Sequence, residues 1–152
     1  AEFLSAFDML YTNKNGLQDK FVAYWEYVAS YFASNPYVIG YDPINEPYPS
    51  NYNVDPSLAM TPGKFDLEKL QPMYERLFAV YKNHSATKIM YYEPGQFPDT
   101  VGVEGGKVFP LGFNGTPGGN QSLSQQVLND HSYCCQKDPK MCSTGEPPLS
   151  RS

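Results

Sequence analysis

A helical spacing of apolar residues recurs in two long stretches of the chain. Between residues 17 and 32, and again between residues 65 and 83, apolar side chains return every three or four positions. This is the spacing of one face of an amphipathic α-helix, so we expect a helix in each stretch. The apolar positions of the first are Phe21, Val22, Trp25, Val28, Ala29 and Phe32, and those of the second are Leu67, Leu70, Met73, Tyr74, Leu77, Phe78 and Tyr81.

The ends of these helices carry their own signals. Asp66 is of a residue type that caps helix N-termini, whereas Pro72 inside the pattern indicates a kink or a start later than Asp66. His84 at the far end is expected to face solvent rather than to bind a ligand. Residues 1–16 are interpreted as the end of a structural unit followed by a turn.

Three short apolar runs predict buried strands. They are Y-V-I-G-Y at residues 37–41, K-I-M-Y-Y at residues 88–92 and Q-V-L-N-D-H-S-Y at residues 126–133. A helix that passes through a tight link into a buried strand is the unit of a repeated β/α architecture. The fold class we expect is therefore α/β with parallel strands.

Two of these strands end in Glu-Pro. The first leads into Asn45-Glu46-Pro47 and the second into Glu93-Pro94. Proline cannot donate to a strand ladder, so the chain must leave the sheet there and bring the glutamates to one edge. A polar turn explains the tripeptide equally well. Limited solvation raises a carboxyl pKa, however, and such a group suits acid–base chemistry. Glu46 and Glu93 can thus be a catalytic pair.

Charge and composition exclude some functions. The net charge of -5, with eleven scattered Lys and Arg, argues against a nucleic-acid partner. Thirteen Tyr and nine Phe suit sugar recognition by ring stacking, and they suit a core equally well. No apolar run reaches the roughly 20 residues of a membrane span. Cys134, Cys135 and Cys142 allow one local disulfide, most plausibly to Cys142, and lack histidines at zinc-finger spacing.

Three Asn-x-Ser/Thr sequences are acceptors for N-glycosylation. They begin at Asn83, Asn114 and Asn120. We therefore expect a secreted protein or one of the secretory pathway or lysosome, with any signal peptide upstream of Ala1.

The run A-S-N-P-Y-V-I-G-Y-D-P-I-N-E-P at residues 33–47 resembles the fourth strand of glycoside hydrolase family five, in particular its endoglycoceramidase-related enzymes. Residues 88–98 and 128–134 extend the resemblance. It implies that the chain is a fragment of a (β/α)8 TIM barrel, from about the third helix to just past the sixth strand. Such barrels take about 250 residues, so residues 1–152 are expected to be the central part of a single catalytic barrel.

The resemblance also implies roles for individual residues. Glu46 would be the acid/base of a retaining mechanism, and Asn45 would bind the sugar hydroxyl next to the scissile bond. His131 would hold the acid/base region and bind substrate, while Tyr133 would hydrogen-bond the nucleophile. That nucleophile belongs to a later strand, so these residues alone should be inactive. Glu93 and Gln96 are then assigned to substrate binding or to holding their loop.

The implied substrate is a glycosphingolipid, cleaved between its sugar and ceramide. Other family-five substrates, of the endoglucanase, mannanase or steryl-glucosidase type, and a non-catalytic glycolipid-binding barrel remain alternatives. Tyr48 and Tyr52 can stack on sugar or only pack within their loop. The apolar residues 108–113 in the long loop of residues 97–124 can pack on the barrel or face lipid. The mechanism requires no metal or cofactor, and contact with a membrane surface would come through the lipid substrate.

Overall fold

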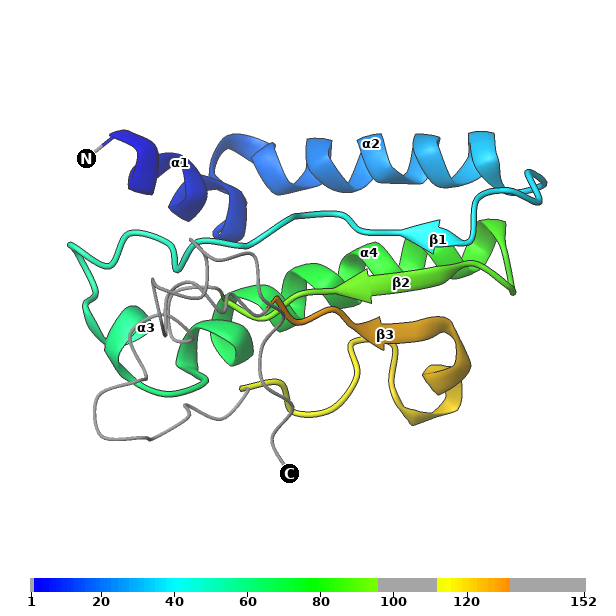
Figure 1. The fold of residues 1–152 in the computed structure, drawn as a ribbon. Coiled ribbons are helices and arrows are strands. Elements are labelled where there is room, and N and C mark those ends of the chain that lie inside the picture. The colour runs from blue at the N-terminus through cyan, green and yellow to red at the C-terminus, as the bar shows by residue number, and fades with distance from the viewer. Residues whose placement is uncertain (1, 96–111, 132–152) are drawn as a thin grey trace, which may run out of the picture.

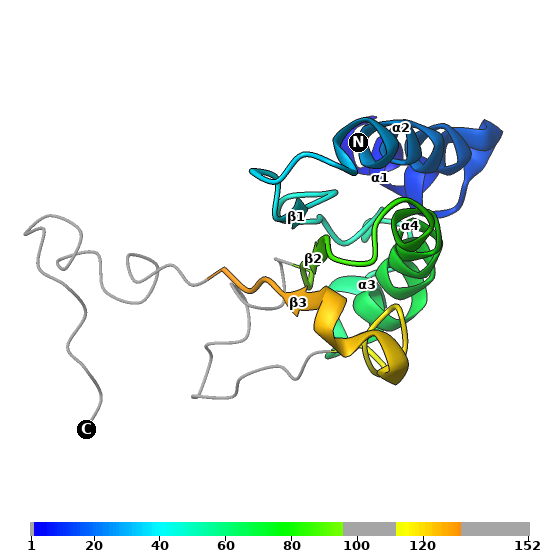
Figure 2. The ribbon, with the colours of Figure 1, turned by 90° about the vertical axis from the view of Figure 1, so that its right-hand side faces the viewer.

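The structure, a computed structural model, describes residues 2–95 and 112–131 and shows helices packed on one face of a small sheet (Figures 1 and 2). The α-helices are α1 (Glu2–Tyr11), α2 (Leu17–Phe32), α3 (Ser57–Met60) and α4 (Gln71–His84). The strands are β1 (Gly40–Tyr41), β2 (Ile89–Tyr92) and β3 (Gln126–Leu128). Two 3₁₀ helices, η1 (Lys14–Gly16) and η4 (Asn120–Gln125), and a π-helical turn, η2 (Asp66–Leu70), complete the order.

The three strands form one parallel sheet in the order β1-β2-β3. The α/β class and the parallel strands predicted from the sequence are thus present. Gly40 lies opposite Ile89, and a Cβ added at Gly40 would stand 2.1 Å from the Ile89 carbonyl oxygen. Glycine therefore allows β1 to approach β2 closely.

Two of the strands are shorter in the structure than the sequence predicts. The first is regular only over Gly40–Tyr41, while Tyr37 and Ile39 are 92% and 68% exposed. The third ends at Leu128 rather than continuing to residue 133. β1 has a strand neighbour on only one side among the described residues, so side chains along its open edge are not covered.

The helices follow the predicted periodicity, with corrections at their starts. α2 covers the predicted span, and residues 2–11 form a helix where the sequence indicated only the end of a unit. α4 begins at Gln71 and carries Pro72 in its first turn, where a missing N–H costs nothing. The capping role predicted for Asp66 was wrong. Its buried carboxylate instead accepts hydrogen bonds from the N–H groups of Gly95 and Gly112, at 2.7 and 3.0 Å.

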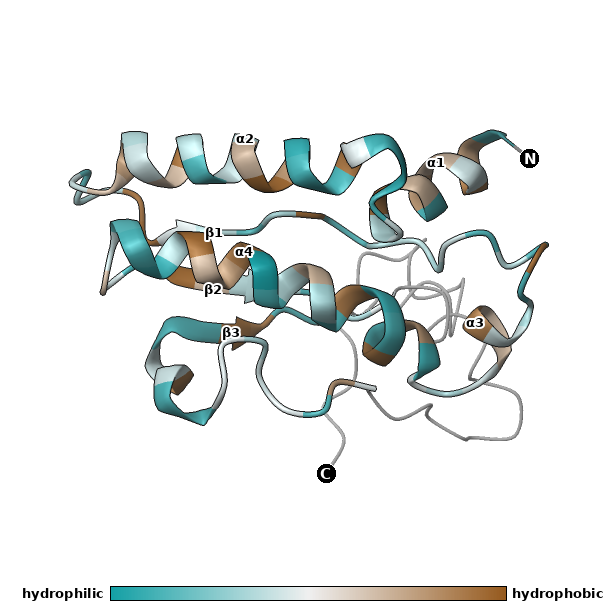
Figure 3. Ribbon diagram, turned by 180° about the vertical axis from the view of Figure 1, so that it is seen from behind, coloured by the Kyte–Doolittle hydropathy of each residue, from teal (hydrophilic) through white to brown (hydrophobic). Residues whose placement is uncertain are grey.

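The core lies between α4, α2 and the sheet. Figure 3 shows hydrophobic and hydrophilic positions alternating along both helices. Trp25 of α2 packs edge-on against Tyr41 and Tyr81. The fully buried side chains of η2, α4 and β2 include Leu70, Met73, Tyr74, Leu77 and Met90. No helix within residues 2–95 and 112–131 has the length and apolar character needed to cross a membrane.

A buried lysine fixes the link between α2 and β1. The Lys88 side chain donates hydrogen bonds from Nζ to the carbonyl oxygens of Asn35 and Val38, and the residue is only 9% exposed. Because the two carbonyls belong to the link and the lysine directly precedes β2, this contact ties the link to the start of β2.

We therefore expect Lys88→Met to destabilise the fold by about 1.5–3 kcal/mol, the range for a hydrogen bond to a charged group. The matched control is Lys82→Met, because Lys82 is exposed on α4. Urea unfolding of both variants in the full-length protein measures the difference. Equal stabilities would show that the Lys88 contacts do not hold the link.

Candidate active site

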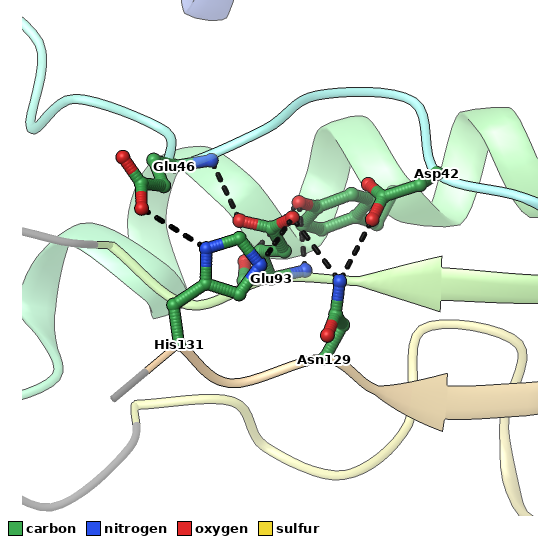
Figure 4. A network of polar contacts seen from close by, with 6 residues as sticks. Asp42, Glu46, Glu93, Asn129 and His131 are labelled. Carbon is green, nitrogen blue, oxygen red and sulfur yellow. Dashed lines mark hydrogen bonds and ion pairs between the residues drawn. The ribbon is translucent and has the colours of Figure 1, made fainter. Parts of the chain in front are cut away.

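The carboxyl ends of the three strands bring polar side chains together at one edge of the sheet (Figure 4). Asp42 and Glu46 follow β1, Glu93 follows β2, and Asn129 and His131 follow β3. Parallel strands end at the same edge, so residues far apart in the sequence meet there without any special connection.

Glu93 is the most buried member of this cluster, at 2% exposure. Its Oε2 accepts a hydrogen bond from the backbone N–H of Glu46 at 2.6 Å, and its Oε1 accepts one from Nδ2 of Asn129 at 3.3 Å. The same Oε1 lies 3.4 Å from Nε2 of His131. Glu93 therefore joins the segments that follow all three strands.

The backbone of Glu93 is held from the helix side. The buried Tyr74 hydroxyl accepts a hydrogen bond from the Glu93 N–H at 3.0 Å and donates one to the Glu93 carbonyl at 3.1 Å. Both backbone groups are thus satisfied just where β2 ends and its ladder stops. The placement of Glu93 follows from α4 as well as from the sheet.

Glu46 has an unusual backbone and a usable side chain. Its φ of 48° lies in the left-handed region, which a residue other than glycine rarely adopts. Its side chain is 22% exposed, and Oε1 lies 3.0 Å from Nδ1 of His131. His131 therefore lies between the two glutamates, with one ring nitrogen toward each (Figure 4).

The charges of the cluster shift its pKa values. Burial raises the pKa of Glu93 to about 6, and the nearby Asp42 carboxylate adds to this, while the Glu46 N–H and His131 oppose it. The pKa of His131 is raised, first by its hydrogen bond to Glu46 and also by the charges of Glu93, Glu46 and Asp42. Both shifts widen the pH range over which Glu93 and His131 hold a proton.

Comparison with known proteins finds two similar curated sequences. The chain is 35% identical over 128 residues to an endoglycoceramidase of Hydra vulgaris, and 33% identical over 129 residues to one of Cyanea nozakii. These matches cover 84% and 85% of this chain. The chain is endoglycoceramidase-related. It spans about a quarter of the length of these curated relatives, 23% and 24%. No protein-family profile matches it.

Solved structures show the same relationship at the level of the fold. Endo-glycoceramidase II from Rhodococcus sp., solved with ganglioside GM3, matches with a TM-score of 0.61 over 86% of this chain and 26% of that one, at 20% identity. Its complex with a five-membered iminocyclitol matches equally well, over 27% of that chain. The helices and parallel strands of this endoglycoceramidase-related chain are thus arranged as in part of that enzyme.

The structure brings some of the predicted site residues together and leaves others apart or outside its described part. It brings Glu46, Glu93 and His131 into contact, while Asn45 is exposed beside Glu46. Gln96 and Tyr133 lie outside the described residues, as do the cysteines and most of the apolar run at residues 108–113. Phe113 at the end of that run packs edge-on against Tyr92, with ring centroids 5.2 Å apart.

Tyr48 belongs to an aromatic cluster at α1. Its ring centroid lies 5.5 Å from that of Phe3, 6.1 Å from that of Phe7 and 6.3 Å from that of Tyr52. The residue is half-buried. The sequence allowed Tyr48 and Tyr52 either to stack on sugar or to pack within their loop, and these contacts support packing.

Sequence reasoning missed Asp42, Asn129 and the hydroxyl of Tyr74. The first two are polar residues placed directly after buried strands, and this position is itself a signal for the functional edge of a parallel sheet. Tyr74 was counted only as an apolar position of its helix, where nothing in the periodicity separates it from Phe78. Within the described part of the chain, no group of three or more His, Cys, Asp or Glu is arranged to hold a metal ion.

We expect Tyr74→Phe to destabilise the protein by about 1–3 kcal/mol, because it leaves two backbone groups of Glu93 without their buried partner. Tyr81→Phe is the matched control. Tyr81 is also buried on α4, and its hydroxyl has no hydrogen-bond partner in the described structure. Denaturant unfolding compares the two, and an equal loss in both variants would contradict a role for the Tyr74 hydroxyl.

Proposed function

We propose that the full-length protein is a retaining glycoside hydrolase that cleaves the β-glycosidic bond between the sugar and the ceramide of glycosphingolipids, with Glu46 as its acid/base. The observation that carries this is the position of Glu46. It is a partly exposed carboxylate at the carboxyl edge of a parallel sheet, held at its backbone by Glu93 and at its side chain by His131. The named endoglycoceramidase relatives support the choice of substrate.

In such a reaction Glu46 donates its proton to the glycosidic oxygen while a second carboxylate attacks the anomeric carbon. The departing oxygen is that of the ceramide primary alcohol. Glu46, now ionised, then takes a proton from the water that hydrolyses the glycosyl-enzyme. His131 is hydrogen-bonded to Glu46 Oε1 and can keep that carboxyl oriented through both steps.

Glu93 is a poor choice for the attacking carboxylate. At 2% exposure, with both oxygens already in contact with Glu46, Asn129 or His131, it has no free surface from which to reach an anomeric carbon. Its burial argues equally against the direct substrate contact predicted for it. We therefore assign the nucleophile to a glutamate outside residues 1–152, as the family resemblance implies.

The remaining assignments follow the same resemblance. We place residues 1–152 in the centre of a single family-five (β/α)8 barrel, from about its third helix to just past its sixth strand. Asn45, exposed beside Glu46, would bind the neighbouring sugar hydroxyl. Gln96 would bind substrate or hold its loop, and Tyr133 would hydrogen-bond the nucleophile. Tyr48 is only half-buried in its aromatic cluster, and its exposed part would contact sugar. The reaction as proposed uses no metal or cofactor, and any membrane contact would come with the lipid substrate.

Glu46→Gln in the full-length protein should lower kcat for lactosylceramide by about 10²–10⁴-fold, the usual contribution of general acid–base catalysis. Glycolipid binding should be retained, because the amide has nearly the same shape. The kcat/KM for a 2,4-dinitrophenyl β-lactoside, which reports the first step only, should fall less, since its phenolate leaves without protonation. Glu75→Gln, at an exposed position of α4, controls for loss of a carboxylate.

Each competing function has its own signature in that assay. A wild-type protein that binds glycolipid but hydrolyses no glycoside would be a binding barrel. Hydrolysis of glucan, mannan or steryl glucoside without cleavage of lactosylceramide would indicate another family-five activity. Full activity of Glu46→Gln toward lactosylceramide would contradict Glu46 as the acid.

We also propose that the protein is secreted or resides in the secretory pathway or lysosome. Asn83, Asn114 and Asn120 are all exposed in the structure, as glycosylation acceptors must be. Removal of N-glycans from the protein isolated from its source should lower its mass, and single Asn→Gln variants should each remove one glycan. An unchanged mass would contradict this location.

A further inference from the structure

The contacts of Glu93 converge on Glu46. The carboxylate of Glu93 binds the one backbone group of Glu46 whose direction depends on its unusual φ, the N–H, at 2.6 Å. It also lies against the imidazole that contacts the Glu46 side chain. A single buried group thus restrains both the main chain and, through His131, the side chain of Glu46.

The backbone of Glu46 requires such a restraint. A left-handed conformation at a residue other than glycine is unfavourable and persists only where surrounding contacts determine it. Among the described contacts, the charge-assisted hydrogen bond from the Glu46 N–H to Glu93 does this directly. Without it, the segment between Pro43 and Pro47 would lose its anchor to β2.

Asn129 supplies the other half of the arrangement. Its amide nitrogen has two hydrogens, and it donates to Oδ2 of Asp42 at 2.8 Å and to Oε1 of Glu93 at 3.3 Å. The amide therefore bridges two carboxylates that would otherwise repel each other. It also leaves Glu93 facing N–H donors on both of its oxygens.

We propose that Glu93 is a positioning residue of the site, which holds Glu46 in its left-handed backbone conformation and, with Asn129 and His131, in the orientation needed for proton transfer. This inference rests on the proposed role of Glu46 as acid/base. Glu93 acts through Glu46 and does not touch the substrate.

The two-acceptor geometry makes Glu93→Gln informative. An amide offers one acceptor oxygen and one NH2 group, so one end must meet either the Glu46 N–H or the Asn129 N–H with another donor. We expect kcat for lactosylceramide to fall about 10- to 100-fold, as for a misplaced catalytic group, with KM changed less than about twofold. As with Glu46→Gln, the loss in kcat/KM should be smaller on the 2,4-dinitrophenyl lactoside, whose first step needs no acid.

A double-mutant cycle separates positioning from general damage. If Glu93 acts through Glu46, then Glu93→Gln should cost little further activity in the Glu46→Gln background. Glu68→Gln is the matched control, because Glu68 is exposed and pairs with Lys64 rather than with a residue of the site. Thermal unfolding of every variant checks the fold. If the double variant is too unstable to assay, Glu93→Asp takes its place. This variant keeps two acceptor oxygens and the charge, so it should recover part of the activity that Glu93→Gln loses.

The pH profile gives a second test. The groups that face Glu93 are Asp42 and Glu46 after β1, Tyr74 on α4, and Asn129 and His131 after β3. With a pKa of about 6, Glu93 takes up a proton as the pH falls, and one of its acceptor oxygens becomes a donor. Activity should fall on that acid limb. Asn129→Asp adds a negative charge beside Glu93, so it should move the limb to higher pH.

Four outcomes would overturn the inference. The first is that the losses of activity from Glu93→Gln and Glu46→Gln multiply, and the second is that Glu93→Gln is as active as Glu68→Gln. The third is that Glu93→Gln raises KM and leaves kcat unchanged, which would mean substrate contact. The fourth is that Asn129→Asp does not move the acid limb of the pH profile. An active wild-type enzyme showing any of these overturns this inference alone. A wild-type protein that hydrolyses no glycoside overturns the proposed function and this inference together.

Discussion

The parallel pairing of three short strands is the constraint on which the rest of the structure depends. β2 lies in the middle, and the segments that follow its two neighbours reach the glutamate at its end. The backbone pairing continues past the sheet, since the N–H of Asn129 donates to the carbonyl of Tyr92. Because both pairings run the same way, one register sets the distances between side chains that stand up to 87 positions apart in the sequence.

The helices determine how this edge is built. Tyr74, in the first half of α4, reaches across the core to Glu93, the residue directly after β2. Lys88 ties the opposite end of the same strand to the link from α2. The central strand is thus fixed at both ends by side chains, which compensates for its being only four residues long.

Much of this could be predicted from periodicity. The two long helices follow from the helical spacing of apolar residues and the three strands from short apolar runs. The Glu-Pro endings place Glu46 and Glu93 on one edge. The limits of the strands could not be predicted, because Ile39 and Tyr41 are both apolar residues of one run, yet Ile39 is exposed and Tyr41 is buried. The burial of Glu93 could not be predicted either, since its contacts with Tyr74, Asn129 and His131 belong to no local pattern.

Asp66 offers a different consequence. Its two carboxylate oxygens bind the N–H groups of Gly95 and Gly112, which flank residues 96–111. Neither position has room for a side chain, since an added Cβ would meet Phe65 at 2.5 Å or the Gly63 carbonyl oxygen at 1.7 Å. One side chain thus holds the residues on both sides of that segment by hydrogen bonds. Since closing a longer loop costs little additional entropy, evolution can lengthen, shorten or replace the intervening chain while the strands beneath keep their register.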